Sequence, residues 1–331
     1  MGTRDMMPGF ELYQPDTLEG ALDLLGRFGS DGWALAGGND SFDWFKDRVK
    51  RPRYVVDLTG IEALKGIRET ADGGVEIGAL TTLTEIERSD VIRSRFGVLA
   101  EAASKVASPQ IRNTGTIGGN LCQDARCWYY RYGVHCYRAG GNTCYADTPE
   151  GQNREHCLWG ADRCVAVSPS DTAPAMVVLD ARMVVAGPNG EREVPAEQFF
   201  IGPSIDITRM TVLEPGELLT AIRIPPSWAG ARFYFEKVAD RNVWDFPLVN
   251  IAAAMRVNGN VIEDARFAAG AVQCTPRRLT VVEEVVRGQP RSEDLARLAG
   301  QSAVRGATPL NYNHFKIPLL QNLVMRAVRD A

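Results

Sequence analysis

Six of the seven cysteines lie between Cys122 and Cys164, in a segment with little regular periodicity. Thiols gathered in this way can form disulfides, bind zinc, or bind an iron–sulfur cluster. Disulfides need an oxidising compartment, and the N-terminal residues lack the apolar stretch of a signal peptide. Zinc sites usually contain tight Cys pairs, whereas the only close pair here is Cys122 and Cys127. A cluster needs four thiolates from a loop and tolerates looser spacing, so the spacing favours a cluster and leaves zinc open.

Two pairs of glycines, in AGGND (36–40) and TIGGN (116–120), are each expected where a strand ends. Glycine lets the backbone come close to a ligand, and successive N–H groups in such turns can bind phosphate. Neither segment matches G-x-G-x-x-G or the P-loop. Either pair alone could be a simple tight turn; two in one chain favour binding of a dinucleotide diphosphate without establishing it.

The elements that must position these residues fall into three groups. Thr17 is expected to cap a helix over 18–28, and strands at 33–35 and 54–58 complete a small α/β unit. A second group contains a strand at 75–80, a helix starting at Thr82, a helix over 96–107 stopped by Pro109, strands at 175–179, 182–186 and 216–224, and a hairpin turn at 188–192.

After the double proline at 225–226, read as a linker, a third α+β unit is expected. It contains three alternating strands, around 231–239, 247–257 and 265–272, followed by helices around 279–287, 292–303 and 315–329. The predicted domains are therefore 1–60, 61–225 with the cysteine insertion at about 122–165, and 226–331.

The composition narrows the class of protein. A chain of 331 residues with 45% hydrophobic residues can bury sizeable cores, and its net charge of −4 argues against a general nucleic-acid binder. No apolar run approaches the ~18 residues that span a bilayer. The expected localisation is cytoplasmic, with export only if a partner carries the signal peptide.

Five segments, in the right order, resemble the FAD-binding subunit of the xanthine dehydrogenase (molybdenum hydroxylase) family. They are LAGGNDSF (35–42), TIGGNLCQDARC (116–127), SPSDTAPAMVVLDA (168–181), GPS…LEPGELLTAIRIP (202–225) and FEKVADRNVWDFPLVNIAAAM (235–255). The resemblance implies an α+β chain: a two-subdomain, PCMH-like FAD-binding fold and a CO dehydrogenase flavoprotein-type C-terminal domain. The cysteine insertion further resembles the flavin subunits of 4-hydroxybenzoyl-CoA reductase and periplasmic-type aldehyde oxidoreductase, which carry an extra 4Fe-4S cluster there.

The resemblance also implies site residues. The FAD-binding positions would be Leu35, Ala36, Gly37, Gly38, Asn39, Asp40, Ser41, Thr116, Gly118, Gly119, Asn120, Asp171, Leu218, Ile224 and Lys237. The family more often has Thr at the position of Asn39. Asp171 would hydrogen-bond the cofactor and Lys237 would lie near the isoalloxazine, although from the residues alone they could be a helix N-cap and a solvated strand charge.

The implied cluster ligands are Cys127, Cys136, Cys144 and Cys164, spaced C-x8-C-x7-C-x19-C. Cys157 lies inside the last gap and is the rival for the fourth position. The resemblance implies no role for Cys122, which lies in the same segment, or for Cys274, which lies far from it in the sequence.

The implied activity is electron transfer within an oxidoreductase. The chain would carry FAD and the 4Fe-4S cluster, and would relay electrons between the 2Fe-2S clusters of a small partner and an external acceptor or donor. A large partner would hold the molybdenum cofactor and act on an aldehyde, an aromatic acyl-CoA or an N-heterocycle. The alternatives are a flavin subunit with a zinc-binding or cluster-free cysteine loop, a stand-alone flavin oxidase, and a non-enzymatic zinc module.

Overall fold

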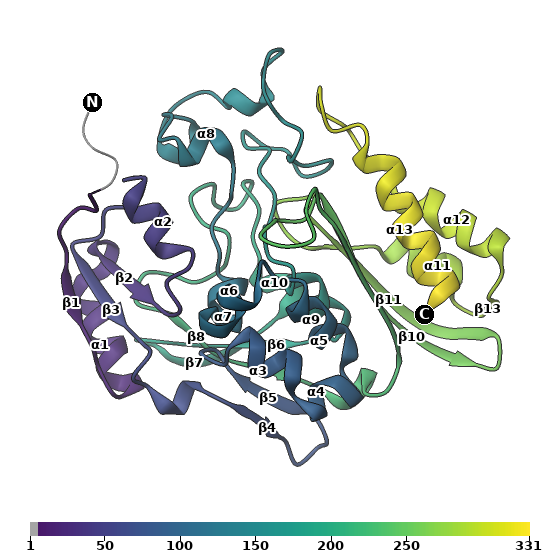
Figure 1. Cartoon of the computed structure of the whole chain (residues 1–331), viewed down its shortest axis with the longest axis horizontal. Coiled ribbons are helices and arrows are strands. Elements are labelled where there is room, and N and C mark those ends of the chain that lie inside the picture. Colours follow the sequence, from purple (N-terminus) through teal and green to yellow (C-terminus); the bar gives the residue numbers. More distant parts are fainter. Residues whose placement is uncertain (1–5) are drawn as a thin grey trace.

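The computed structural model describes residues 6–331, which form three sheets in chain order (Figure 1). The first sheet is parallel, in the order β1 (Glu11–Tyr13), β3 (Tyr54–Asp57), β2 (Gly32–Leu35). Helix α1 (Leu18–Phe28) packs on it, and helix α2 (Ser41–Lys46) follows β2. Thr17 caps α1 by accepting a hydrogen bond from the amide of Gly20, which confirms the predicted helix start.

The second sheet is antiparallel, in the order β4-β5-β8-β6-β7. Its strands are β4 (Ile67–Glu69), β5 (Val75–Gly78), β6 (Arg182–Gly187), β7 (Gly190–Pro195) and β8 (Leu218–Ile224). The accompanying helices are α3 (Leu83–Arg88), α4 (Asp90–Arg95), α5 (Gly97–Ser104), α6 (Pro109–Thr114), α7 (Ile117–Leu121), α9 (Ala173–Val178) and α10 (Ala196–Phe199).

The third sheet is antiparallel and has the order β12-β11-β10-β9, with β13 paired to β11. Its strands are β9 (Arg232–Val238), β10 (Val249–Asn258), β11 (Val261–Gly270), β12 (Arg277–Arg278) and β13 (Gln289–Pro290). Helices α11 (Thr280–Val286), α12 (Glu293–Ala303) and α13 (Lys316–Asp330) cover one face (Figure 1).

Strand β10 joins two cores. Ile251, Ala253 and Met255 pack with the C-terminal helices, whereas Ala252 and Ala254 pack with the second unit. Successive side chains of a strand point to opposite faces, so a strand covered on both sides has an almost continuously apolar sequence. The third unit therefore packs against the second through β10, an internal strand of its sheet.

The cysteine segment contains α8 (Trp128–Arg131) and short helical turns, and projects above the second sheet in Figure 1. Buried Arg138 hydrogen-bonds Asp124 and donates to the carbonyl of Ile207 at 2.7 Å. Asp124 also pairs with Lys50 of the first unit at 3.2 Å. These contacts fix the segment to the rest of the chain without regular secondary structure.

Three predicted elements are wrong, for two physical reasons. Residues 175–178 belong to α9 and Leu179 is its C-cap, so no strand forms there, because an apolar run buried on every side does not distinguish helix from strand. Pro109 begins α6 and does not end a helix, since proline is favoured in the first helical turn and Ser108 caps it. Likewise, TIGGN starts α7 after the Thr116 cap and does not close a strand.

None of the helices in residues 6–331 has the length and apolar character needed to cross a membrane.

Candidate functional site

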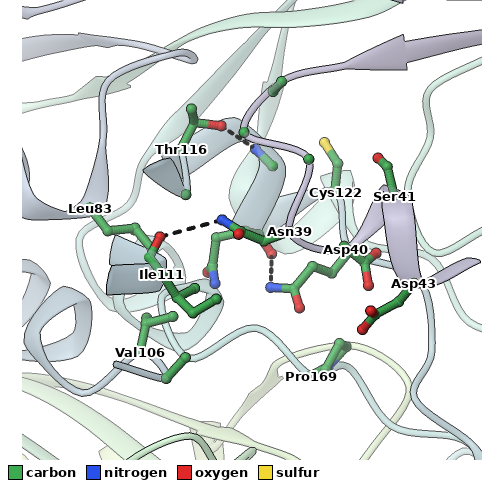
Figure 2. Close-up of a pocket in the computed structure, with 18 of the residues that line it drawn as sticks. Asn39, Asp40, Ser41, Asp43, Leu83, Val106, Ile111, Thr116, Cys122 and Pro169 are labelled. Atoms are coloured by element: carbon green, nitrogen blue, oxygen red, sulfur yellow. Dashed lines mark hydrogen bonds between the residues drawn. The ribbon is translucent and has the colours of Figure 1, made fainter. Parts of the chain in front are cut away.

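A cavity of about 260 Å³ lies between the first and second units (Figure 2). The turn after β2 and the start of α7 both line it, together with the loop that precedes α9. Ten of the predicted FAD-binding residues lie on its wall: Ala36, Gly37, Gly38, Asn39, Asp40, Ser41, Thr116, Gly119, Asn120 and Asp171. The structure thus brings together residues from three distant parts of the chain.

The AGGND turn has a geometry that requires glycine. A Cβ on Gly37 would overlap the carbonyl oxygen of Thr114, and one on Gly38, where φ is +75°, would meet the ring of Phe42 at 2.6 Å. Within residues 6–331, the backbone amides of residues 37–41 donate no hydrogen bond. A run of unpaired amides on a cavity wall is a suitable cradle for an anionic group such as a pyrophosphate.

Polar side chains order the second glycine segment and tie the AGGND turn to the helix before it. Thr116 Oγ1 accepts a hydrogen bond from the amide of Gly119 at 3.1 Å. Asn39 Nδ2 donates to Thr114 Oγ1 at 3.1 Å and to the carbonyl of Ile111 at 3.4 Å, the latter drawn in Figure 2. Asn39 therefore links the AGGND turn to α6, the helix that precedes the second glycine segment.

Asn120 ties α7 to the loop that precedes α9. Its Oδ1 accepts hydrogen bonds from Ser170 Oγ at 2.7 Å and Thr172 Oγ1 at 2.6 Å, and all three residues are buried. Asn120 thus holds in place the loop that contains Asp171.

Asp171 and Lys237 form a buried ion pair. Asp171 Oδ2 accepts from Lys237 Nζ at 2.7 Å and Oδ1 accepts from Asn250 Nδ2 at 3.0 Å; the two charged side chains are only 3% and 7% exposed. Burial raises the pKa of Asp171, and the bonds from Lys237 and Asn250 act in the opposite direction. Asp171 therefore does not act as a helix N-cap, and Lys237 is not a solvated charge on a strand. Asp171 lines the cavity, whereas Lys237 contacts Asp171 and does not line the cavity.

Besides Lys237, four predicted positions lie off the cavity wall. Leu35 packs in a core of the first unit, and a Cβ on Gly118 would meet the carbonyl oxygen of Ala79 at 2.8 Å. Leu218 and Ile224 are on β8, where their side chains pack in the cores of the first and second units. β8 is an internal strand paired on both sides, and the assignment of Leu218 and Ile224 to the flavin site stays a prediction.

The loop between β9 and β10 lines the cavity and was missed from sequence. Arg126 Nη1 pairs with Asp40 Oδ1 at 2.7 Å, and its guanidinium lies 4.6 Å from the centre of the Phe246 ring. Trp244, with φ of +64°, donates its amide hydrogen to the carbonyl of Ala107 at 2.8 Å. The turn residues of RNVWDFP were the available signal, but nothing in the sequence gave their distance from AGGND.

A second, smaller cavity is lined by the four predicted cluster ligands, Cys127, Cys136, Cys144 and Cys164. Tyr129, Tyr130, Tyr137 and Tyr145 surround the thiols, and Cys157 is not on the wall. Burial raises the pKa of Cys127 to about 12. No group of three or more His, Cys, Asp or Glu side chains in residues 6–331 has the geometry to hold a single metal ion.

Two family models cover most of the chain. Residues 8–227 match the FAD binding domain in molybdopterin dehydrogenase, and residues 234–331 match the CO dehydrogenase flavoprotein C-terminal domain.

Curated relatives and solved structures agree with these matches. The chain is 31% identical to the carbon monoxide dehydrogenase medium chain of Hydrogenophaga pseudoflava, over 98% of this chain and 97% of that one. It is 32% identical to the aldehyde oxidoreductase FAD-binding subunit of Escherichia coli, over 90% of each. The solved CO dehydrogenase of Hydrogenophaga pseudoflava superposes with a TM-score of 0.77 at 29% identity, covering 98% of this chain and 97% of that one. The chain therefore belongs to the family of FAD-binding medium subunits of molybdenum hydroxylases.

Proposed function

We propose that this chain is the FAD- and 4Fe-4S-containing electron-transfer subunit of a heteromeric molybdenum-dependent hydroxylase or dehydrogenase. The observation that carries the proposal is the single cavity onto which AGGND, TIGGN and Asp171 converge. Its partners would be a large subunit with the molybdenum cofactor and a small subunit with 2Fe-2S clusters. Similarity to carbon monoxide dehydrogenase medium chains over nearly the whole chain supports this assembly.

For FAD, the residues present fit the cofactor. The unpaired amides of residues 37–41 would hold the pyrophosphate, and Thr116 and Gly119 line the same cavity. Arg126, which is ion-paired with Asp40 and Asp43, lies close to that cradle. When bound, FAD would exchange one or two electrons. The chain's own residues would bind and orient it, and the β9–β10 loop would limit the access of water.

For the cluster, the donor set also fits. Four thiols line one cavity, walled by tyrosines, and four thiolates are the usual ligands of a 4Fe-4S cluster. When bound, the cluster would supply one-electron exchange beside the flavin site. A structural zinc is the rival occupant and would need four ligands about 2.0–2.3 Å from one ion.

The three domains, 1–60, 61–225 and 226–331, are part of the same proposal. What supports the division is that each range contains one of the three sheets.

The test is the flavin and metal content of the anaerobically purified chain, with an EPR spectrum after dithionite reduction. About four irons and one FAD per chain are expected. Zinc in place of iron would refute the cluster and leave the flavin. A chain that binds neither FAD nor iron would refute the whole proposal.

Replacing Gly37 by alanine should weaken FAD binding. The new methyl group would overlap the carbonyl oxygen of Thr114, and forcing atoms into a filled site costs about 1–3 kcal/mol. The affinity for FAD should therefore fall roughly 5- to 150-fold, as measured by fluorescence titration of the flavin-free chain. Gly202→Ala is the matched control because a Cβ there meets no atom within 4 Å. Equal affinity in both variants would remove AGGND from the flavin site.

A further inference from the structure

His156 is a buried side chain that none of the implied cofactor sites uses. It is 4% exposed, and its Nε2 lies 3.2 Å from the sulfur of Cys127. Its other ring nitrogen, Nδ1, is buried and has no hydrogen-bond partner within residues 6–331. Among residues 6–331, Cys127 Sγ is the one partner of the ring with hydrogen-bond geometry, so a proton on Nε2 is directed at the sulfur.

The position of His156 is fixed by its backbone. Lys316 Nζ, which is fully buried, donates to the carbonyls of Glu155 at 3.0 Å, His156 at 3.0 Å and Ala271 at 2.8 Å. Asn313 Nδ2 donates to the carbonyl of His156 at 3.0 Å as well. Helix α13 and the end of β11 therefore hold this part of the cysteine segment in place, so the contact with Cys127 is built into the fold.

His156 lines a third cavity, of about 490 Å³, between the cysteine cavity and the flavin cavity. This third cavity shares Arg126, Trp244 and Phe246 with the flavin cavity. Of the four candidate ligands, Cys127 alone lines both the third cavity and the cysteine cavity. Of the candidate ligands, Cys127 therefore lies nearest the flavin cavity, and His156 lies on the same side of it.

His156 does not have the placement of a fifth ligand. It is absent from the wall of the cysteine cavity, and its ring nitrogen meets the Cys127 sulfur. A hydrogen bond from an N–H to the sulfur of a cysteine ligand changes the charge distribution on that sulfur. It adds no ligand to the iron.

We propose that His156 is a positioning residue that donates its Nε2–H to the Cys127 sulfur and thereby raises the reduction potential of the cluster. This inference rests on the proposed function, because it needs the cluster to be present. Reduction of a bound cluster would add one electron, which reduced FAD would supply, and would increase the negative charge on the sulfurs. A hydrogen bond to a sulfur stabilises that added charge, and hydrogen bonds to the sulfurs are one of the determinants of cluster potential. No proton moves and no bond to His156 breaks.

The test is an EPR-monitored redox titration of the full chain with its cofactors, in three variants. His156→Leu removes the donor and keeps an apolar side chain of similar size. His156→Gln keeps an N–H close to the position of Nε2. His135→Leu is the matched control, a histidine of the same segment that is exposed.

In His156→Leu the equilibrium constant for cluster reduction should fall about tenfold, which is a downward shift of about 59 mV for a one-electron couple. His156→Gln should recover most of this shift, and His135→Leu should match the wild type. Four irons must remain in every variant, as measured by iron content.

Three results would overturn the inference. They are an unchanged potential in His156→Leu, an equal loss in the Gln and Leu variants, and loss of iron from both, which would make His156 necessary for holding the cluster. A wild-type chain without iron is a different result, because it refutes the cluster itself. The iron content of the wild type therefore separates failure of the proposed function from failure of this inference.

Discussion

Cys164→Ser is expected to abolish the iron–sulfur cluster, whereas Cys157→Ser is expected to retain it. Cys164 lines the cavity with the other three thiols, while Cys157 packs in a separate small core with Ala146 and Val165. Removing one of four thiolates should leave an incomplete cluster site. Iron should fall from about four per chain to background in Cys164→Ser and remain at about four in Cys157→Ser.

Iron analysis and the EPR signal of the reduced protein measure this difference. The two residues are a matched pair, since both are buried cysteines of the same segment. FAD content provides the control for folding, because neither residue lines the flavin cavity. Iron retained in Cys164→Ser and lost in Cys157→Ser would assign the fourth ligand to Cys157.

Local signals made most of the fold predictable. Helix α1 follows from the Thr17 cap and its apolar face, and strands β9, β10 and β11 follow from their length and turn boundaries. Prediction failed at α9 and α7, where burial on all sides and a short capped helix imitate a strand and a glycine turn. In both places tertiary packing, which the sequence does not state, decided the conformation.

The residues of the candidate site also differ in whether local sequence motifs identify them. AGGND, TIGGN and Asp171 were identifiable as motifs, and the structure brings them to one cavity. Arg126 and Phe246 were not, because their contact joins residues 120 positions apart and depends on how the third unit meets the second. Lys237 is the intermediate case. The resemblance identified it as a site residue, but its role as the buried partner of Asp171 could be seen only in the folded structure.

Lys237→Met is expected to destabilise the protein by about 3–5 kcal/mol, because it leaves the buried carboxylate of Asp171 without its counter-charge. The substitution also removes hydrogen bonds to the carbonyls of Lys105 at 3.0 Å and Asp245 at 2.6 Å. The free energy of unfolding from urea titration should fall by that amount. FAD should be released more readily, since Asp171 and Asp245 both line the flavin cavity.

The matched control is Lys65→Met, a lysine paired with exposed Glu62, where the loss should stay below about 1 kcal/mol. The double variant Asp171→Asn with Lys237→Met should recover part of the stability, because a neutral amide beside Asn250 carries no buried charge. If the double variant were no more stable than Lys237→Met alone, the lost hydrogen bonds, and not the unpaired charge, would be the cause. In that case Lys237 would act as a cross-link between α5, the β9–β10 loop and the site, and Asp171 would tolerate a change of charge.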